Sequence, residues 1–432
     1  MMTTRRTARR SAPRATRAVL AAVMLTSMAA CDLDTLLQVD APSRIPADRL
    51  ETPANATLLV NSAVGDFECA YGAYTVAGGL IGEELADGIQ TADRYPYDRR
   101  SVAPIDLRYS TFSCTAIGMY APLQTARVQA ENILSLLQGW TDDEVPNRQQ
   151  LMATAAAHAG WSLLLLGEGF CSMVVSTIDE NRQVVYGGEI TRDSVFKLAE
   201  ARFTQAIDGS TDASITNMAL LGRAKARQNL GRLAEAKTDA AQVPAGFVRN
   251  VTASATSSRR QNRVFSESSP TSTSSVVAAP YRELTDPRIP LGRHTPPRNT
   301  VTGIPVVYQT KYDDAADPIP FATGDEAQLI IAEAELAAGN LDAARTIINF
   351  FRTRAGQGEF AGGSAAELRD ELIEQRRREL FLEGQHLGDL IRYQITPTPA
   401  VGTAYHGSGT YGNQLCMPLP DVETRNNPVA GG

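Results

Sequence analysis

The segment 147–166 constrains the fold most strongly, because it has the composition of a helix and no polar face. It contains four consecutive leucines, Leu163–Leu166, and a cluster of alanines around His158 and before Trp161. A helix that is apolar on nearly all sides must be covered all round, so it belongs in the interior of a larger assembly. We therefore expect His158 to be a core histidine whose polar atoms are hydrogen-bonded, and Trp161 to be a packing residue.

Neighbouring segments predict the helices that cover this one. Apolar residues recur at intervals of three and four in 124–138 and again in 192–207, which is the spacing of one helical face. Strand-like alternation is confined to short pieces such as 183–186 and 306–308. The fold class is therefore mainly α. A chain of 432 residues that is 43% apolar is long enough for one large core.

Two segments near 213–242 and 325–352 share a pattern that predicts helical hairpins. Leu221–Ala226 leads to a turn at Gly231, and Leu329–Ala334 leads in the same register to a turn at Gly339. Glycine suits the left-handed position that ends a helix, and the pattern is of the tetratricopeptide type. An ordinary helical hairpin would explain either copy alone, but the shared register favours a common unit.

Between the hairpins, residues 249–302 are rich in Ser, Thr, Arg and Pro. Such a composition buries little apolar surface, so we expect a long surface loop. Loops of this length either carry function or are disordered, and the composition leaves both readings open.

The N-terminus has the pattern of an export signal. Residues 1–30 carry six arginines and no acidic residue, and an apolar stretch at 18–25 precedes small residues and Cys31. A cysteine directly after Ala29–Ala30 resembles a bacterial lipobox, although Met28 stands where leucine is usual. We expect Cys31 to be lipidated, which would tether the protein to a membrane. The alternative is an ordinary signal peptide followed by a chance cysteine.

The expected organisation is a lipoprotein signal peptide at 1–30, a polar tether at 31–53 and a helical domain at 54–432. Without residues 1–30 the chain has 35 basic and 48 acidic side chains, a net charge of −13. Phosphate backbones would repel such a body, which argues against nucleic-acid binding. The remaining apolar runs are too short to predict a membrane-spanning helix. We expect the acidic clusters to be solvated, namely Glu83–Glu84 with Asp87, Asp142–Asp143 and Asp313–Asp314.

The cysteines and histidines indicate no metal or cofactor. The exported setting favours disulfides among four further cysteines, in one of three connectivities, although four buried thiols are the alternative. The histidines lie in different segments without the spacing of zinc ligands. The chain also lacks the serine-hydrolase elbow, the H-E-x-x-H motif and the phosphate loop, so we do not expect an enzyme. The four cysteines are Cys69, Cys114, Cys171 and Cys416.

The segment 373–392 reads I-E-Q-R-R-R-E-L-F-L-E-G-Q-H-L-G-D-L-I-R and resembles the C-terminal signature of the SusD/RagB family. That signature pairs an E-R-x-x-E-L stretch with E-G-x-R and D-L-x-R. The chain departs from it at Gln375, where glutamate is usual, and at His386, where arginine is usual. Lys311–Tyr312 and Met417–Pro420 also follow the family order. The spacing within the signature places its charges on one helix face, so we expect a packing network.

The resemblance implies a single large helical domain with tetratricopeptide-like hairpins and long irregular loops. It also implies a lipoprotein of the cell outer membrane that faces outward. Such proteins bind a nutrient, often an oligosaccharide, and work with a TonB-dependent transporter. Two other functions stay open: a helical-repeat scaffold that binds only protein, and a surface hydrolase.

Sugar binding requires aromatic faces together with hydrogen-bonding groups. Trp140 and Trp161 fall on or beside helices and are assigned to packing, so tyrosines between the helices are the candidates. The segment 95–100, Y-P-Y-D-R-R, combines rings with polar groups. Tyrosines that cap a helical core are the alternative explanation. The predicted ligand-binding residues are Tyr95, Tyr97, Arg99, Tyr109 and Tyr281.

Overall fold

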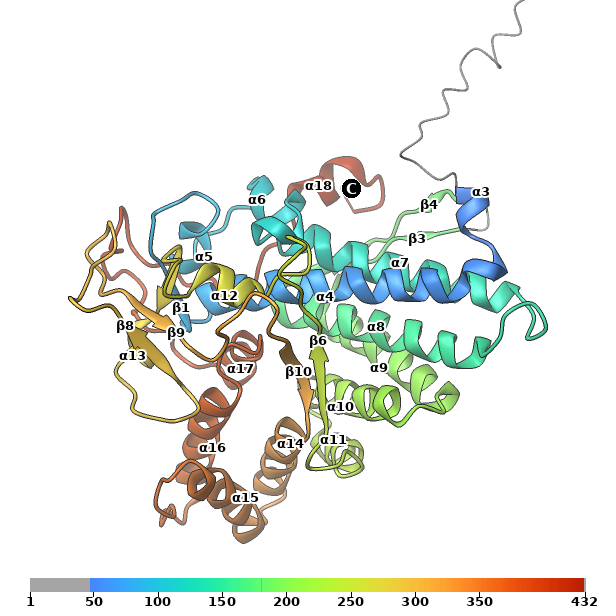
Figure 1. Ribbon diagram of the computed structural model, residues 1–432. Coiled ribbons are helices and arrows are strands. Elements are labelled where there is room, and N and C mark those ends of the chain that lie inside the picture. The colour runs from blue at the N-terminus through green and yellow to red at the C-terminus, as the bar shows by residue number, and fades with distance from the viewer. Residues whose placement is uncertain (1–46, 180, 431–432) are drawn as a thin grey trace, which may run out of the picture. The chain divides into compact units, whose positions relative to one another are not determined.

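The computed structural model describes residues 47–179 and 181–430 (Figure 1). The predicted signal peptide, Cys31 and most of the predicted tether lie outside the described residues. The chain divides into a unit of residues 1–50 and a unit of residues 51–432. Only the short helix α3 (Ala47–Leu50) is described in the first unit. The elements below all belong to the second.

Three long helices form the centre of this unit and pack against one another (Figure 1): α4 (Ala56–Ile81), α7 (Tyr120–Gly139) and α8 (Arg148–Gly169). Helix α8 is the segment without a polar face, and every residue from Ala155 to Gly169 is buried. Helix α9 (Arg192–Gly209) covers its other side. The predicted core positions are confirmed: Trp161 donates to the Met218 carbonyl at 3.2 Å, and His158 Nδ1 lies 2.8 Å from the Thr154 carbonyl.

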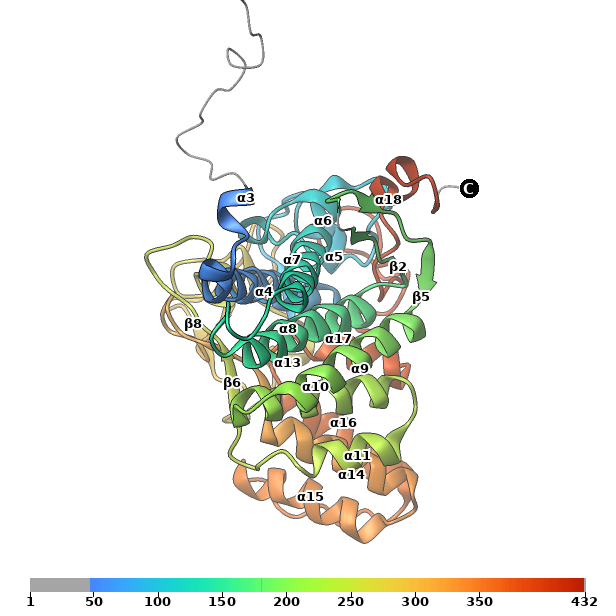
Figure 2. The ribbon, with the colours of Figure 1, turned by 90° about the vertical axis from the view of Figure 1, so that its right-hand side faces the viewer.

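Both predicted hairpins are present and they pack together in space (Figure 2). The first joins α10 (Ala213–Asn229) to α11 (Leu233–Ala240), and the second joins α14 (Gly324–Ala337) to α15 (Leu341–Arg354). The turn glycines have positive φ, +73° at Gly231 and +79° at Gly339, as the register predicts. Helix α11 contacts α14, so hairpins far apart in the sequence are neighbours.

Helix α16 (Ala365–Glu379) extends the second hairpin, and α17 (His386–Tyr393) returns the chain to the central helices. A buried cluster of aliphatic and aromatic side chains joins α14, α15 and α16. Ser364 caps α16 through a reciprocal hydrogen-bond pair with Glu367. The buried cluster comprises Leu329, Ala332, Ile348, Phe351, Leu368, Leu372 and Leu380.

The other elements are short, so the prediction of a mainly α fold is confirmed. The strands of the described residues form five antiparallel pairs, β1–β7, β2–β5, β3–β4, β6–β10 and β8–β9. The strands are β1 (Leu85–Asp87), β2 (Ser172–Val174), β3 (Thr177–Ile178), β4 (Val184–Val185), β5 (Glu189–Thr191), β6 (Val248–Val251), β7 (Ser275–Val277), β8 (Leu291–Arg293), β9 (Val307–Gln309) and β10 (Ile319–Thr323). The remaining helices are η1 (Pro53–Asn55), α5 (Tyr95–Asp98), α6 (Leu107–Thr111), η2 (Cys114–Ala116), α12 (Arg263–Glu267), α13 (Ala279–Arg282) and α18 (Asp421–Asn426).

The expectation that residues 249–302 form only a surface loop is wrong in part. All three residues of β7 are buried, and β7 pairs with β1. Val264 and Tyr281 are also fully buried. The apolar residues of this segment are few and scattered, so its average composition hides the short pieces that enter the core.

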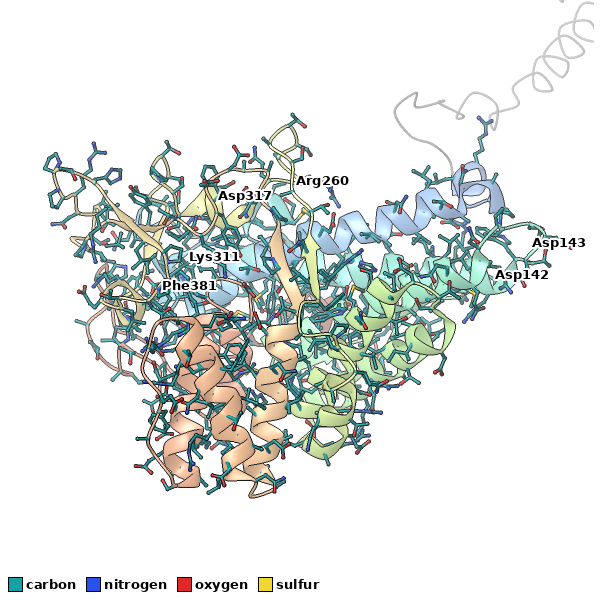
Figure 3. All side chains as sticks on the ribbon, turned by 60° about the horizontal axis from the view of Figure 1, so that its bottom comes forward. Asp142, Asp143, Arg260, Lys311, Asp317 and Phe381 are labelled. Carbon is teal, nitrogen blue, oxygen red and sulfur yellow. A yellow bond between two sulfur atoms is a disulfide. The ribbon has the colours of Figure 1, made fainter. Side chains whose placement is uncertain are left out.

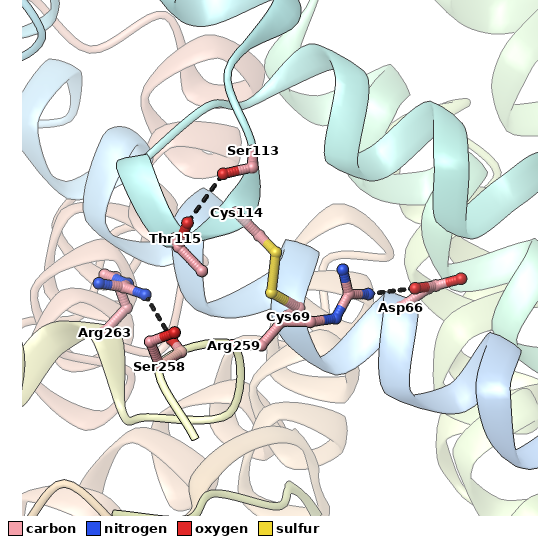
Figure 4. The surroundings of a disulfide bond; sticks show 8 residues. All are labelled: Asp66, Cys69, Ser113, Cys114, Thr115, Ser258, Arg259 and Arg263. Carbon is pink, nitrogen blue, oxygen red and sulfur yellow. Dashed lines mark hydrogen bonds and ion pairs between the residues drawn. A yellow bond between two sulfur atoms is a disulfide. The ribbon is translucent and has the colours of Figure 1, made fainter. Parts of the chain in front are cut away.

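The structure joins the four cysteines in two disulfides. Cys69–Cys114 connects α4 to η2, and Figure 4 shows it beside the ion pair of Arg259 with Asp66. Cys171–Cys416 connects the second residue after α8 to the C-terminal segment across 245 positions. The second bridge therefore holds the last part of the chain against the central helices.

The buried lysine Lys225 is surrounded by polar groups from three other segments. Lys225 of α10 donates to Glu326 Oε1 of α14 at 2.6 Å and to the Gln385 side chain. Its Nζ lies 3.7 Å from Glu168 Oε1 of α8. A buried ammonium without such partners would carry a large desolvation cost, so these contacts restrict how the segments pack.

The signature segment contributes a second buried ion pair. The Arg376 guanidinium of α16 donates to both carboxylate oxygens of Asp389 on α17, at 2.8 and 3.0 Å. Arg392 donates to the same carboxylate at 2.9 Å. These guanidiniums lower the pKa of Asp389 to about 2, although burial alone would raise it. The signature is thus a packing network, as the spacing predicts.

The turn between α16 and α17 is held tightly against α4. Gly384 has φ of +73°, and a side chain there would lie 3.0 Å from Thr75 Oγ1. Lys311 donates to the Phe381 carbonyl at 2.8 Å and to Glu383 at 2.6 Å, and it lies beside Phe381 in Figure 3. Glu84 Oε1 accepts the Leu382 N–H at 2.7 Å. Burial raises the pKa of Glu84 to about 8.

We expect Gly339→Val to destabilise the second hairpin by about 1–2 kcal/mol, because a β-branched residue disfavours positive φ. Ala338→Val is the matched control, since Ala338 is exposed and has right-handed helical angles. Denaturant titration gives the free energy of unfolding of both variants. Equal values for Gly339→Val and the control would contradict the assigned turn.

We expect the stability contribution of Glu84 to decline as pH rises. Its pKa is about 8 in the folded protein against an ordinary value of 4.5, so folding takes up a proton between these values. Stability is then lost with rising pH by about 1.4 kcal/mol per pH unit in that window. Glu84→Gln removes the titration and keeps an oxygen for the Leu382 N–H.

The measurement is the unfolding free energy of wild type and Glu84→Gln at pH 5.5, 6.5 and 7.5. The difference should shift in favour of the variant at each step. Glu283→Gln, at a carboxylate whose side chain is 76% exposed, provides the surface control. A difference that stays constant over this range would show that Glu84 is ionised in the fold.

Candidate functional site

A cavity of about 230 Å³ lies beside the segment 95–100 that the sequence singles out. Its walls come from parts of the chain that are far apart in sequence: the residues after α4, the segment of α5, helix α13 and the C-terminal stretch 398–411. Aliphatic side chains such as Leu80 and Ile304 form part of the wall. Charged and aromatic side chains form the rest, so the cavity offers both kinds of contact.

Hydrogen bonds from α5 bring these segments together. Asp98 Oδ2 accepts the Asp87 N–H at 2.8 Å, which joins α5 to β1. Strand β1 pairs with β7, and β7 leads directly into α13. The Arg100 guanidinium donates to the carbonyls of Pro399 and Gly412, which holds the C-terminal stretch over the cavity. The side chains of Asp98 and Arg100 therefore assemble the cavity, because they bind main-chain groups of the segments around it.

Two carboxyl groups in the wall are buried. Burial raises the pKa of Glu83 to about 7. The hydrogen bond from the Thr398 N–H and the charge of Arg100 lower this pKa, but burial has the larger effect. Burial also raises the pKa of Asp98 to about 7, against the hydrogen bonds from the Asp87 N–H and the Tyr405 hydroxyl. Both carboxyls therefore change protonation near neutral pH.

The expectation that the acidic cluster at 83–87 is solvated is wrong. Glu83, Glu84 and Asp87 are at most 8% exposed, because the chain passes from the buried end of α4 directly into the buried strand β1. Net charge does not report such local burial. The other acidic pairs are exposed as expected, and Figure 3 shows Asp142 and Asp143 in the loop between α7 and α8.

An aromatic group from the C-terminal stretch lies against these carboxyls. The rings of Tyr405 and His406 have centroids 4.0 Å apart, and those of Tyr405 and Tyr411 lie edge to face at 5.1 Å. His406 Nε2 lies 3.3 Å from Asp98 Oδ2, and burial lowers the pKa of His406. The sequence analysis missed this group. Its only signal is a pair of tyrosines and a histidine within the glycine-rich run 402–412.

Three of the predicted ligand-binding residues are buried. Tyr97 and Tyr109 direct their hydroxyls at main-chain carbonyls, those of Ile117 at 3.4 Å and Pro104 at 3.3 Å. Tyr281 stacks on Phe381 with centroids 5.0 Å apart. Protein surrounds these rings, so they present no face to a ligand in this structure.

The other two predicted residues, Tyr95 and Arg99, are partly exposed and lie together. The Arg99 guanidinium lies 5.2 Å from the Tyr95 ring centroid and donates to the Ser408 carbonyl at 3.0 Å. Arg99 thus supports the same C-terminal stretch that carries His406 and Tyr411. We keep Tyr95 and Arg99 as candidates beside the cavity.

The chemistry of the site favours binding. Within the part of the chain that the structure describes, no group of His, Cys, Asp and Glu is arranged to hold a metal ion. Glu83 and Asp98 each accept hydrogen bonds from protein groups, so their oxygens serve to position neighbouring segments. Stacking surfaces, hydroxyls and guanidiniums remain for a polar ligand with apolar faces.

Comparison with known proteins supports the resemblance. The model of the SusD family matches residues 326–425. No curated protein matches the chain. Solved structures share the fold at low sequence identity. A SusD superfamily protein from Bacteroides vulgatus ATCC 8482 has a TM-score of 0.69 at 14% identity, over 88% of this chain and 98% of its own.

Two further structures are similar. A SusD superfamily protein from Parabacteroides distasonis ATCC 8503 has a TM-score of 0.69 at 13% identity, over 90% of this chain and 99% of its own. A SusD-like carbohydrate binding protein from Bacteroides vulgatus ATCC 8482 has a TM-score of 0.65 at 15% identity, over 88% of this chain and 97% of its own. The SusD family model thus matches the C-terminal part of this chain, and the solved SusD superfamily structures share its fold.

Proposed function

We propose that this protein is an outward-facing lipoprotein of the outer membrane that binds a nutrient oligosaccharide and passes it to a TonB-dependent transporter. The observation that carries the binding role is the cavity at 95–100, where an aromatic group and buried polar side chains meet. The name of the similar carbohydrate binding protein supports the same class of ligand.

The cavity suits a sugar on chemical grounds. A sugar ring has apolar C–H faces that stack on aromatic rings, and it has hydroxyls that need donors and acceptors. Tyr411 and His406 supply rings and polar atoms at one wall. A protonated carboxyl donates a hydrogen bond and an ionised one accepts, so the second oxygens of Glu83 and Asp98, beyond Glu83 Oε1 and Asp98 Oδ2 that bind protein groups, offer either role near neutral pH.

The membrane location rests on the N-terminal pattern and the family. Within residues 47–179 and 181–430, none of the helices is both long and apolar enough to cross a bilayer. Lipidation at Cys31 would supply an anchor, and the tether would leave the folded unit free to meet a transporter.

A second candidate function is a scaffold that binds another protein, and one observation favours it. A groove of about 640 Å³ lies between the two hairpins and is lined by alanines of both hairpins and by charged residues at the start of α11. Helical repeats use such grooves for extended partners. The two proposals therefore place the ligand at different ends of the fold.

Tryptophan substitutions separate these sites. Ala279 and Ala404 are exposed and line the cavity, so Ala279→Trp should fill it without disturbing the core. We expect this variant to lose at least tenfold in affinity for an oligosaccharide returned by a glycan array, measured by calorimetric titration. Ala338→Trp places the same ring at the hairpin groove and should bind normally.

The reverse pattern, with binding lost only in Ala338→Trp, would favour the scaffold. Binding of no glycan by the wild-type protein would contradict the proposed function. Hydrolysis of the bound oligosaccharide, followed by chromatography of the products, would instead identify a surface hydrolase.

We also expect Cys31→Ser to abolish incorporation of labelled palmitate and to release the protein from the membrane fraction, because the acyl chains attach at this thiol. Cys171→Ser is the control, since it removes a cysteine that is disulfide-bonded in the fold. Equal label in wild type and Cys31→Ser would refute lipidation at this position.

A further inference from the structure

We propose that the ligand of this cavity is an acidic sugar, and that Arg282 binds its carboxylate. The inference rests on the proposed function and assigns the ligand class of the same site. It depends on one unusual side chain in the wall: an arginine that is largely buried and donates no hydrogen bond to any residue that the structure describes.

Arg282 ends helix α13 and lines the cavity, where its side chain is 18% exposed. Arg282 lines the same cavity as His406 and Tyr411, so it lies in the wall that carries the aromatic group. Helix α13 is positioned by β7 and by the stacking of Tyr281 on Phe381. The fold therefore holds the guanidinium in the cavity.

The N–H groups of Arg282 are free for a ligand. Among the described residues, its guanidinium donates no hydrogen bond, and its one ion pair is to its sequence neighbour Glu283 at 3.6 Å. The Glu283 side chain is 76% exposed, so water weakens this pair. By contrast, the Arg100 guanidinium in the same wall donates to two main-chain carbonyls. The Arg100 guanidinium therefore positions the cavity wall, whereas the N–H groups of Arg282 are available to a ligand.

A carboxylate fits this guanidinium. The planar fork of arginine donates two parallel hydrogen bonds to a carboxylate, which gives both affinity and orientation. The rings of His406 and Tyr411 beside it would contact the apolar face of a sugar that carries the carboxylate. A small free anion would leave that aromatic wall unused, so the arrangement favours a uronic acid over an inorganic ion.

Charge balance in the cavity depends on pH. Burial raises the pKa of Glu83 and of Asp98 to about 7, so both are mostly ionised at pH 8, where they would oppose an anionic ligand, and mostly protonated at pH 6. A uronate stays ionised at pH 6, so its binding should strengthen as pH falls from 8 to 6. The titratable and charged groups that face the site are Glu83 after α4, Asp98 and Arg100 of the α5 segment, Arg282 and Glu283 at α13, and Tyr405, His406 and Tyr411 of the C-terminal stretch.

The experiment compares tetragalacturonic acid with its fully methyl-esterified, uncharged form by calorimetric titration of the full-length protein. We expect wild type to bind the acid at least tenfold more tightly. Arg282→Gln should lose that preference and keep its affinity for the ester. Arg282→Lys, which keeps the charge but not the fork, should fall between them.

Arg345→Gln makes the same change in net charge on α15, where Arg345 pairs with Asp342, and should leave the preference intact. A melting curve for each variant shows that the fold is retained. Wild-type affinity ten times higher for the acid at pH 6 than at pH 8, with the ester unaffected, would support the assigned site.

The two proposals fail in different ways. If the ester, or another neutral glycan, binds in a manner that Ala279→Trp blocks, but Arg282→Gln changes nothing, the acidic-sugar inference is overturned and the glycan-binding function stands. If Arg345→Gln abolishes the preference as strongly as Arg282→Gln, overall charge is responsible and the inference again fails. If neither form binds and no other glycan does, both proposals are overturned.

Discussion

The burial of Lys225 is the interaction on which the arrangement of this fold depends. An ammonium removed from water must be paired, and the groups that pair it come from α8, α14 and the turn before α17. Removing one partner would leave a buried charge, so the elements can pack in few other ways. The hairpins and the central helices are thereby joined at one point.

The C-terminal signature segment 373–392 supplies one of the partners of Lys225. Arg376 and Asp389 fasten α16 to α17, and the turn between these helices presents Gln385 to Lys225 and the Leu382 N–H to Glu84. Glu84 immediately precedes β1, which pairs with the strand leading into α13. A chain of packed and hydrogen-bonded groups therefore runs from the signature to the cavity wall, and the signature itself has a structural role.

The sequence predicts those elements of the fold that have a repeated or periodic residue pattern. The apolar segment that becomes α8 and the turns at Gly231 and Gly339 are such features, and the structure has them as expected. Burial of isolated residues is different, because Glu83, Asp87 and Tyr281 are covered by segments that are a hundred or more positions away in the sequence. Gln375 and His386 depart from the family pattern, and local sequence does not predict their partners either. The side-chain oxygen of Gln375, for example, accepts a hydrogen bond from Arg288 at 2.9 Å. For this reason a prediction from local pattern selects three tyrosines that are buried, Tyr97, Tyr109 and Tyr281.

The proposed function places a ligand in the cavity assembled by the C-terminal stretch. Hydrogen–deuterium exchange with and without a saturating oligosaccharide can locate the bound ligand without altering the protein. We expect slower exchange in peptides that cover 278–282 and 398–412, with no change in 231–241 or 334–341. Protection confined to the two hairpin peptides, with the cavity peptides unchanged, would contradict it.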